Sequence, residues 1–342
     1  MRTFHLTILV VRQLLLTFFI GNCFWACQPE NNYVHLTGQA QGTTFSILYE
    51  PTESKPYQSE VDSIFRGVDQ SMSLWLDNSL ISRFNDGADS IKVDALFKEV
   101  FERSAYFNEI SNGAFDPTVG PLMDAWGFAR KHDLDLPSDE QIDSLKALIG
   151  FSKCHLKGEY LFKDVPGVQL DFNAIAQGFT ADLMGRFLES KGVNNYLVEI
   201  GGEVLARGVN NKGRKWRVGI ESPEFNSGEG MNALQAVVAL SEGSLATSGN
   251  YRKYIVKDEK VYSHTIDPST CKPVTHSLLS VSVIAPNAMD ADAFATMFMV
   301  LGEEEALKLA EKNGLKIQCI RSENGELEVS YSPGFQEMIL TE

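Results

Sequence analysis

The segment between Ser244 and Leu301 constrains the fold and the chemistry of this chain more than any other. Its last part, AMDADAFATMFMVL, contains no glycine or proline before Gly302. Residues of this kind are well tolerated in a helix interior, so we expect a helix from about Ala288 to Leu301. Because nearly all of its side chains are apolar, this helix is expected to be buried.

Two polar residues of that apolar helix, Asp292 and Thr296, are candidate ligands. Asp292 and Thr296 are four residues apart, so their side chains lie one above the other on the same face. A buried carboxylate and hydroxyl at this spacing fit Mg²⁺, which takes oxygen ligands from one or two carboxylates and leaves places for substrate phosphate. The alternative is structural: an Asp in the first turn complements the helix dipole, and a Thr within a helix bonds back to the preceding turn.

The residues before the helix add a histidine and a group of small residues. SHTIDPSTCKP is typical of a strand end followed by a tight turn, and His264 stands where the strand stops. Histidine changes charge near neutral pH, so His264 is a candidate acid or base, although such a residue is often only a surface residue. Upstream, ATSGNYRKY predicts a small-residue turn in which Thr247, Ser248 and Gly249 let a planar or phosphorylated ligand approach the backbone.

The motifs ATSGxY, SHxIDPxT and ADAxAT, in this order and at these separations, resemble those of the ApbE family of flavin transferases. The resemblance covers about residues 38 to 321. Periodicity by itself indicates only a mixture of helices and strands. The resemblance implies an α+β fold of largely antiparallel sheets with packed helices, in two intimately joined subdomains with the flavin nucleotide between them.

The resemblance also implies an activity. Members of this family are FAD:protein FMN transferases, which bind FAD and Mg²⁺, cleave the pyrophosphate, attach FMN through a phosphoester bond to a Thr or Ser of a target flavoprotein, and release AMP. By this resemblance Asp292, Thr296 and the Ala174 carbonyl hold the cation, and His264 assists proton movement. The expected acceptors are flavoprotein subunits of Nqr- and Rnf-type membrane redox complexes. Two alternatives remain open: an FAD pyrophosphatase giving FMN and AMP, and a non-catalytic flavin-binding lipoprotein.

Further motifs in the first half of the chain match the family. They include MSLWLDNSLISRFN, GAFDPTVGPLMDAWGF and LDFNAIAQG. The residues that the resemblance assigns to flavin binding are Gln41, Trp75, Ala114, Phe115, Asp116, Asp171, Gln177, Thr247, Ser248, Gly249, Thr265 and Ile266. Trp75 has the shape to stack on the flavin ring, although a Trp after an amphipathic helix is usually a core residue.

Three positions of this chain depart from the family pattern. Gln41 replaces a Met, Asn173 replaces a small residue, and Gln177 replaces a Lys or Glu. Without the resemblance, the GAFDPTVGPLMDAWGF segment would be interpreted as a structural loop with a buried Trp126.

Periodicity predicts the remaining elements. A hairpin or kinked strand is expected around Gly42, a strand ending at Asp171, and a hairpin with a Gly-Gly turn in NNYLVEIGGEVLARG. The further helices predicted from apolar spacing are Ser59–Ser71, Ala95–Ser111, Asp139–Leu148 and Ile175–Glu189. The start of the last helix is a natural phosphate site, because its free amides and its dipole favour negative charge.

The N-terminus resembles a targeting segment. An apolar run is followed by the polar sequence QPENN, and Cys27 follows the small residue Ala26. We expect a lipoprotein signal peptide at 1–26, lipidation of Cys27, a tether at 27–37 and a flavin transferase domain at 38–342. An uncleaved anchor helix is the alternative. In both cases the domain lies on the periplasmic side of a bacterial cell membrane, attached to it.

The charge of the chain excludes one class of partner. The sequence has 342 residues and a formal net charge of -15. Nucleic acid backbones are held by clustered Lys and Arg, so nucleic acid is not an expected partner.

Overall fold

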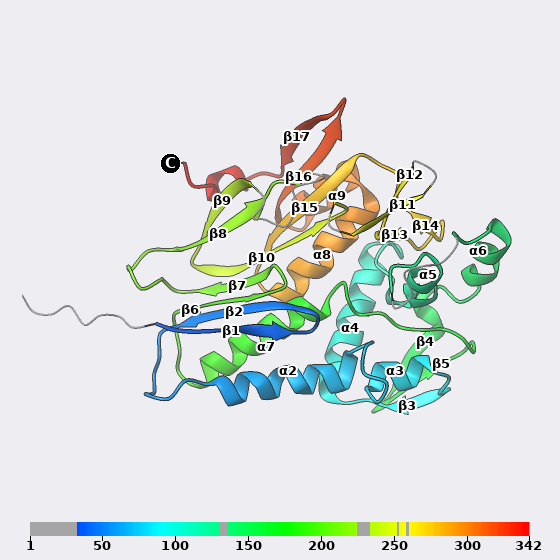
Figure 1. Ribbon diagram of the computed structural model, residues 1–342, viewed down its shortest axis with the longest axis horizontal. Coiled ribbons are helices and arrows are strands. Elements are labelled where there is room, and N and C mark those ends of the chain that lie inside the picture. The colour runs from blue at the N-terminus through cyan, green and yellow to red at the C-terminus, as the bar shows by residue number, and fades with distance from the viewer. Residues whose placement is uncertain (1–32, 130–135, 224–232, 252, 258–259, 342) are drawn as a thin grey trace, which may run out of the picture.

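The computed structural model contains an antiparallel sheet of eight strands (Figure 1). It describes residues 33–129, 136–223, 233–251, 253–257 and 260–341. In spatial order, the strands are β1 (Val34–Ala40), β2 (Thr43–Tyr49), β6 (Tyr196–Ile200), β7 (Glu203–Arg207), β10 (Glu242–Gly249), β15 (Leu278–Ala285), β16 (Lys316–Glu323) and β17 (Glu326–Tyr331).

The order of strands in this sheet follows the chain, and smaller sheets are inserted between its neighbours. They are β3 (Ser90–Lys92) with β5 (Tyr160–Lys163) and β4 (Cys154–Lys157); β8 (Trp216–Glu221) with β9 (Leu234–Leu240); β11 (Tyr254–Lys257) with β12 (Lys260–Ser263); and β13 (Ile266–Asp267) with β14 (Lys272–Pro273). The predicted hairpin around Gly42 is confirmed as β1 and β2. Gln41 and Gly42 both have positive φ, 55° and 74°, as a two-residue hairpin turn of the primed type requires.

The predicted helices are all present, with ends that shift by one or two residues. The helices in the described ranges are α2 (Gln58–Met72), α3 (Leu80–Asn85), α4 (Ala95–Ile110), α5 (Gly120–Ala125), α6 (Asp139–Lys146), α7 (Ala176–Ser190), α8 (Ala288–Leu301) and α9 (Glu303–Lys312), with short 3₁₀ turns η1 (Pro117–Val119), η2 (Phe151–Lys153) and η3 (Gln336–Met338).

Alternating side chains of the main sheet face two different layers. On β7, Leu205 packs with the cluster that contains α2 and α7, whereas Val204 and Ala206 pack with the cluster that contains β8 and β9. This alternation is the ordinary consequence of the two-residue period of a strand. Helices α7 and α8 therefore cover one face and the β8–β9 ribbon covers the other, as Figure 1 shows. The expected α+β architecture is confirmed.

Two local predictions are wrong. The segment before Asp171 does not pair as a strand. Instead, the Asn85 side chain imitates a strand partner for Leu170, since its amide donates to the Leu170 carbonyl and accepts from the Leu170 N–H, both at 2.8 Å. The small residues Thr247 and Gly249 lie at the end of strand β10, not in a turn.

The predicted signal peptide and Cys27 lie outside the described residues. The sheet begins at Val34, within the segment 27–37 that was expected to be a tether. Among the helices in the described ranges, none combines the length and the apolar character that crossing a membrane requires.

Candidate active site

The candidate site is built where helices α7 and α8 touch. A Cβ atom at Gly178 of α7 would lie 2.2 Å from the Ala288 carbonyl oxygen and 2.8 Å from the Asp292 Cβ of α8. Only a glycine allows the two backbones to approach this closely. The contact places the first turn of α7 directly against the carboxylate of Asp292.

Asp292 is buried and its carboxylate faces α7. Its Oδ2 accepts a hydrogen bond from the Gly178 N–H at 3.0 Å, and this is the one hydrogen bond it makes within the described residues. Burial, with a smaller effect of the Asp182 charge, raises the pKa of Asp292 to about 7. The carboxylate thus lacks the several donors that usually stabilise a buried negative charge.

Thr296 lies one turn further along α8. Its hydroxyl lies 3.1 Å from the Ser248 hydroxyl of strand β10. In the described part of the chain, Thr296 therefore bonds across to the sheet and not back to the preceding turn of its own helix.

These groups form a set of oxygen donors. Within the described ranges, no group of three or more His, Cys, Asp or Glu side chains is arranged to hold a metal ion. Of the expected ligands, Asp292 and Thr296 lie one turn apart on α8, and Ala174 stands two residues before the first residue of α7. This set suits Mg²⁺, which binds through few carboxylates and keeps places for water and phosphate, and does not suit a metal that needs imidazole or thiolate ligands.

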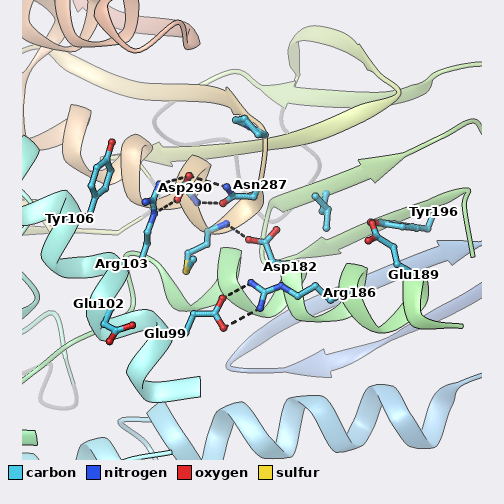
Figure 2. A pocket seen from close by; sticks show the side chains of 13 residues that line it. Glu99, Glu102, Arg103, Tyr106, Asp182, Arg186, Glu189, Tyr196, Asn287 and Asp290 are labelled. Atoms are coloured by element: carbon cyan, nitrogen blue, oxygen red, sulfur yellow. Dashed lines mark hydrogen bonds and ion pairs between the residues drawn. The ribbon is translucent and has the colours of Figure 1, made fainter. Parts of the chain in front are cut away.

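A second buried carboxylate, Asp182 on α7, lies next to the start of α8. Figure 2 shows it pointing at the first turn of that helix, where it accepts from the Ala288 N–H at 2.8 Å and the Met289 N–H at 2.9 Å. Burial raises its pKa to about 6, although the two amide donors oppose the shift. Asp182 also borders an open cleft of about 700 Å³ between α4, α7 and the start of α8.

The start of α8 is held from α4 as well. Arg103 donates two hydrogen bonds of 2.6 Å to the carboxylate of Asp290, and Arg186 of α7 pairs with Glu99 of α4 (Figure 2). Both arginines that line the cleft are therefore already paired with carboxylates.

Two glutamines were expected to bind the flavin, and both lie at the N-terminal end of α7. The Thr180 hydroxyl donates its proton to the Ala176 carbonyl, so it accepts from the Gln41 amide nitrogen, 3.0 Å away. Gln177 lies against Gly201, in the turn between β6 and β7. Both departures from the family pattern therefore lie at the N-terminal end of α7.

Two expected aspartates lie on adjacent loops. The Asp171 N–H donates to the Pro117 carbonyl at 2.7 Å, which joins the loop before α7 to the loop that carries Asp116. The Asp116 carboxylate accepts from the Thr118 N–H and hydroxyl and from the Phe151 N–H. Burial raises the pKa of both aspartates. Asp116 already accepts three hydrogen bonds from two residues of the protein.

Trp75 is 62% exposed. It lies in the loop between α2 and α3, where its N–H donates to the Ser73 hydroxyl and Ser79 donates to the Ser73 carbonyl. The exposure excludes the alternative in which Trp75 fills the core. Trp126, in contrast, is buried as expected, and its ring N–H donates to the Cys271 carbonyl at 3.0 Å.

His264 follows strand β12 and is half-buried. Its Nδ1 lies 3.0 Å from the Lys253 carbonyl, and because a carbonyl only accepts, Nδ1 carries the proton. Burial lowers the pKa of His264 to about 4, so the ring is neutral near pH 7 and Nε2 carries a lone pair. Burial raises the pKa of Asp171, and the positive charge of Lys253 opposes this rise, so Lys253 lies near the loop that carries Asp171.

The other residues assigned to the flavin differ in exposure. Phe115, Thr265 and Ile266 are buried, whereas Ala114, Thr247 and Gly249 are half-buried. The Thr265 hydroxyl donates to the Asn250 side chain at 2.6 Å, and the Thr247 hydroxyl lies 2.7 Å from that of Ser282. Thr247 thus bonds to the neighbouring strand, whereas Ser248 faces α8.

The sequence patterns indicate no role for Asp182 or Asn85. Asp182 could have been found because it is a carboxylate one turn after Gly178, on the buried face of an amphipathic helix. The partner of Asn85 is a backbone 85 residues further along the chain, and no local pattern indicates it.

Comparison with known proteins shows what this arrangement is similar to. The model of the ApbE family matches residues 41–320. Proteins named FAD:protein FMN transferase from Vibrio cholerae serotype O1 and Haemophilus influenzae are 35% and 37% identical, over 90% and 88% of this chain and 93% and 90% of their own. Among solved structures, the flavin transferase ApbE from Vibrio cholerae has a TM-score of 0.81 at 33% identity, covering 90% of this chain and 99% of that one. The Pseudomonas stutzeri flavinyl transferase ApbE in its apo form also has a TM-score of 0.81, at 34% identity, covering 90% and 96%.

Proposed function

The chain belongs to the ApbE family and is an FAD:protein FMN transferase, and from this premise we propose how its residues carry out the transfer. The hydroxyl oxygen of a Thr or Ser on an acceptor protein forms a bond to the phosphorus on the FMN side of FAD. The bond from that phosphorus to the oxygen of the AMP phosphate breaks. AMP leaves, and FMN remains on the acceptor through a phosphoester.

Mg²⁺ is the proposed cofactor, held by Asp292, Thr296 and the carbonyl of Ala174. When bound there, the ion would neutralise charge on the pyrophosphate as the bond breaks. The observation that carries this assignment is the Asp292 carboxylate, which is buried on an apolar helix with a single N–H donor. A buried carboxylate with so little compensation is stabilised by a cation.

His264 is the proposed proton acceptor. Its neutral ring carries a lone pair on Nε2, because Nδ1 donates to the Lys253 carbonyl. Nε2 would take the proton that the acceptor hydroxyl loses when its oxygen attacks phosphorus.

Four of the other residues expected at the flavin are assigned contacts with the bound nucleotide. Trp75 is exposed and available to stack on the flavin ring. Gln41, Gln177 and Asp171 lie around the start of α7 and are proposed to contact the same nucleotide.

We also propose that the enzyme is a lipoprotein attached through Cys27 to a bacterial cell membrane, with its domain on the periplasmic side. The sequence around Cys27 supports this, and those residues lie outside the described structure. Flavoprotein subunits of Nqr- and Rnf-type redox complexes are the proposed acceptors.

In the decisive experiment, purified protein is incubated with FAD and Mg²⁺, with and without an acceptor protein that bears a Ser or Thr site, and the flavin products are identified. Covalent FMN on the acceptor supports the proposal. Release of free FMN and AMP at an equal rate in both samples would replace transfer by hydrolysis, and unchanged FAD would contradict both.

Two variants test the metal assignment in the same assay. Loss of one electrostatic group of this kind typically costs on the order of 10² to 10³ in rate, so we expect at least that loss in Asp292→Ala. Thr296→Ala should lose less, because water can replace a neutral hydroxyl in a magnesium shell. Folded Asp292→Ala protein that transfers FMN at the normal rate, or wild-type transfer that survives chelation, would contradict the site.

A further inference from the structure

Helices α7 and α8 supply each other's capping groups. The first backbone N–H groups of a helix have no partner within that helix. At the start of α8, the N–H groups of Ala288 and Met289 donate to Asp182 of α7. At the start of α7, the Gly178 N–H donates to Asp292 of α8.

The two carboxylates differ in how many of their oxygens accept a hydrogen bond. Each oxygen of Asp182 accepts a hydrogen bond from one amide of α8, so both oxygens of this side chain hold the start of α8. Asp292 uses only Oδ2 within the described residues, which leaves Oδ1 for another partner.

The position of α8 along α7 decides whether the proposed cation ligands meet. Ala174 precedes α7, whereas Asp292 and Thr296 belong to α8, so a small slide of one helix past the other would separate them. Packing at Gly178 fixes how closely the helices approach, because backbone and Cβ atoms are in contact there. The two hydrogen bonds of Asp182 fix the slide, because they tie one residue of α7 to two successive amides of α8.

We propose that Asp182 is a positioning residue that sets the register of α8 against α7 and so assembles the cation site of the transferase. The inference rests on the proposed function. Asp182 touches neither the ion nor the flavin in this assignment and acts only through α8.

Asp182→Asn is the sharpest test, because the side chain keeps its size. An amide oxygen can accept from one of the two N–H groups, but the amide nitrogen would then face the other donor. Asp182→Ala removes both bonds. We expect both variants to bind metal about 10- to 100-fold more weakly, as is typical when a group that orients a metal ligand is changed.

Metal binding is measured directly with Mn²⁺, by the loss of the free-ion electron paramagnetic resonance signal in protein without FAD. Mn²⁺ prefers the same oxygen ligands as Mg²⁺. FAD affinity without metal and the thermal midpoint are recorded for each variant, so that loss of folded protein is not mistaken for loss of the site.

Asp94→Ala is the matched control. Asp94 caps α4 by accepting from the Phe97 N–H at 2.8 Å and the Ser71 hydroxyl at 2.9 Å. Its removal also uncaps a packed helix, and we expect a lower thermal midpoint with unchanged Mn²⁺ affinity.

The outcomes separate the inference from the function on which it rests. Wild-type Mn²⁺ affinity in both Asp182 variants, or an equal loss of affinity in Asp94→Ala, would overturn the positioning role alone. A wild-type protein that binds no Mn²⁺ and transfers FMN in the presence of chelator would overturn the cation site and this role with it.

Discussion

Replacing Gly178 by Ala tests the helix contact on which the candidate site depends. The added Cβ would lie 2.2 Å from the Ala288 carbonyl oxygen, so the backbones of α7 and α8 would have to move apart by about 1 Å. Overpacking of this kind costs about 1–3 kcal/mol, and the upper end applies because the obstacle is backbone. Since Ala is about 1 kcal/mol better than Gly in a helix, we expect a net loss of about 2 kcal/mol.

The thermal midpoint of Gly178→Ala should therefore fall by about 4–8 °C, at about 2–4 °C per kcal/mol for a domain of this size. Metal affinity should fall as well, because the same movement separates Asp292 from the Gly178 N–H.

Gly67→Ala is the matched control for this change. Gly67 is also a helix residue, but its added Cβ would meet only Leu96 Cδ1, at 3.8 Å, which is an ordinary contact. This variant should melt at or above the wild-type temperature. A Gly178→Ala protein that behaves like Gly67→Ala and binds Mn²⁺ normally would refute the close-contact argument.

Four further predictions concern the flavin, the pH dependence of stability and of Mg²⁺ affinity, and the membrane. Bound FAD should have strongly quenched fluorescence that Trp75→Ala relieves without a change in thermal midpoint, because the side chain is 62% exposed; unchanged quenching would remove Trp75 from the flavin site. In metal-free protein the raised pKa of Asp292 means that this group takes up a proton on folding between about pH 4 and pH 7. Its contribution to stability should therefore be greatest below this window and fall as the pH rises through it, as melting curves of the wild type and Asp292→Asn would show. Mg²⁺ requires the ionised carboxylate, so its affinity should fall about tenfold per pH unit below about pH 7, and a pH-independent titration would contradict this. Cys27→Ser should release the protein from the membrane fraction, and unaltered fractionation would show that Cys27 is not the anchor.

Elements with a strong local period could be predicted from the sequence. The apolar spacing of α2, α4 and α7 gave their bounds within a residue or two, and the absence of breakers gave α8. The segment before Asp171 could not be assigned correctly, because the backbone of Leu170 bonds to the side chain of Asn85 and not to a neighbouring strand. A side-chain partner of this kind produces no pattern of alternating apolar residues in the sequence.

The candidate site was predictable as a set of residues and not as a geometry. The spacing of Asp292 and Thr296 on one helix was readable, since it depends only on the helical period. That Asp292 meets Gly178, and that Asp182 holds the other helix, depends on contacts more than 100 residues apart along the chain. Local patterns carry no information about such pairs.

The exchange of caps between α7 and α8 also determines when the site can mature during folding. The main sheet adds its strands in chain order, so neighbouring strands can pair soon after they are made. The Gly178 amide, in contrast, can form its hydrogen bond only after Asp292, 114 residues later in the chain, has been made. The Asp182 carboxylate likewise needs the amide of Ala288, which lies 106 residues later. Until α8 docks, α7 has an uncapped amide at Gly178 and a carboxylate at Asp182 without its partners, so most of the main sheet can form before the proposed cation site does.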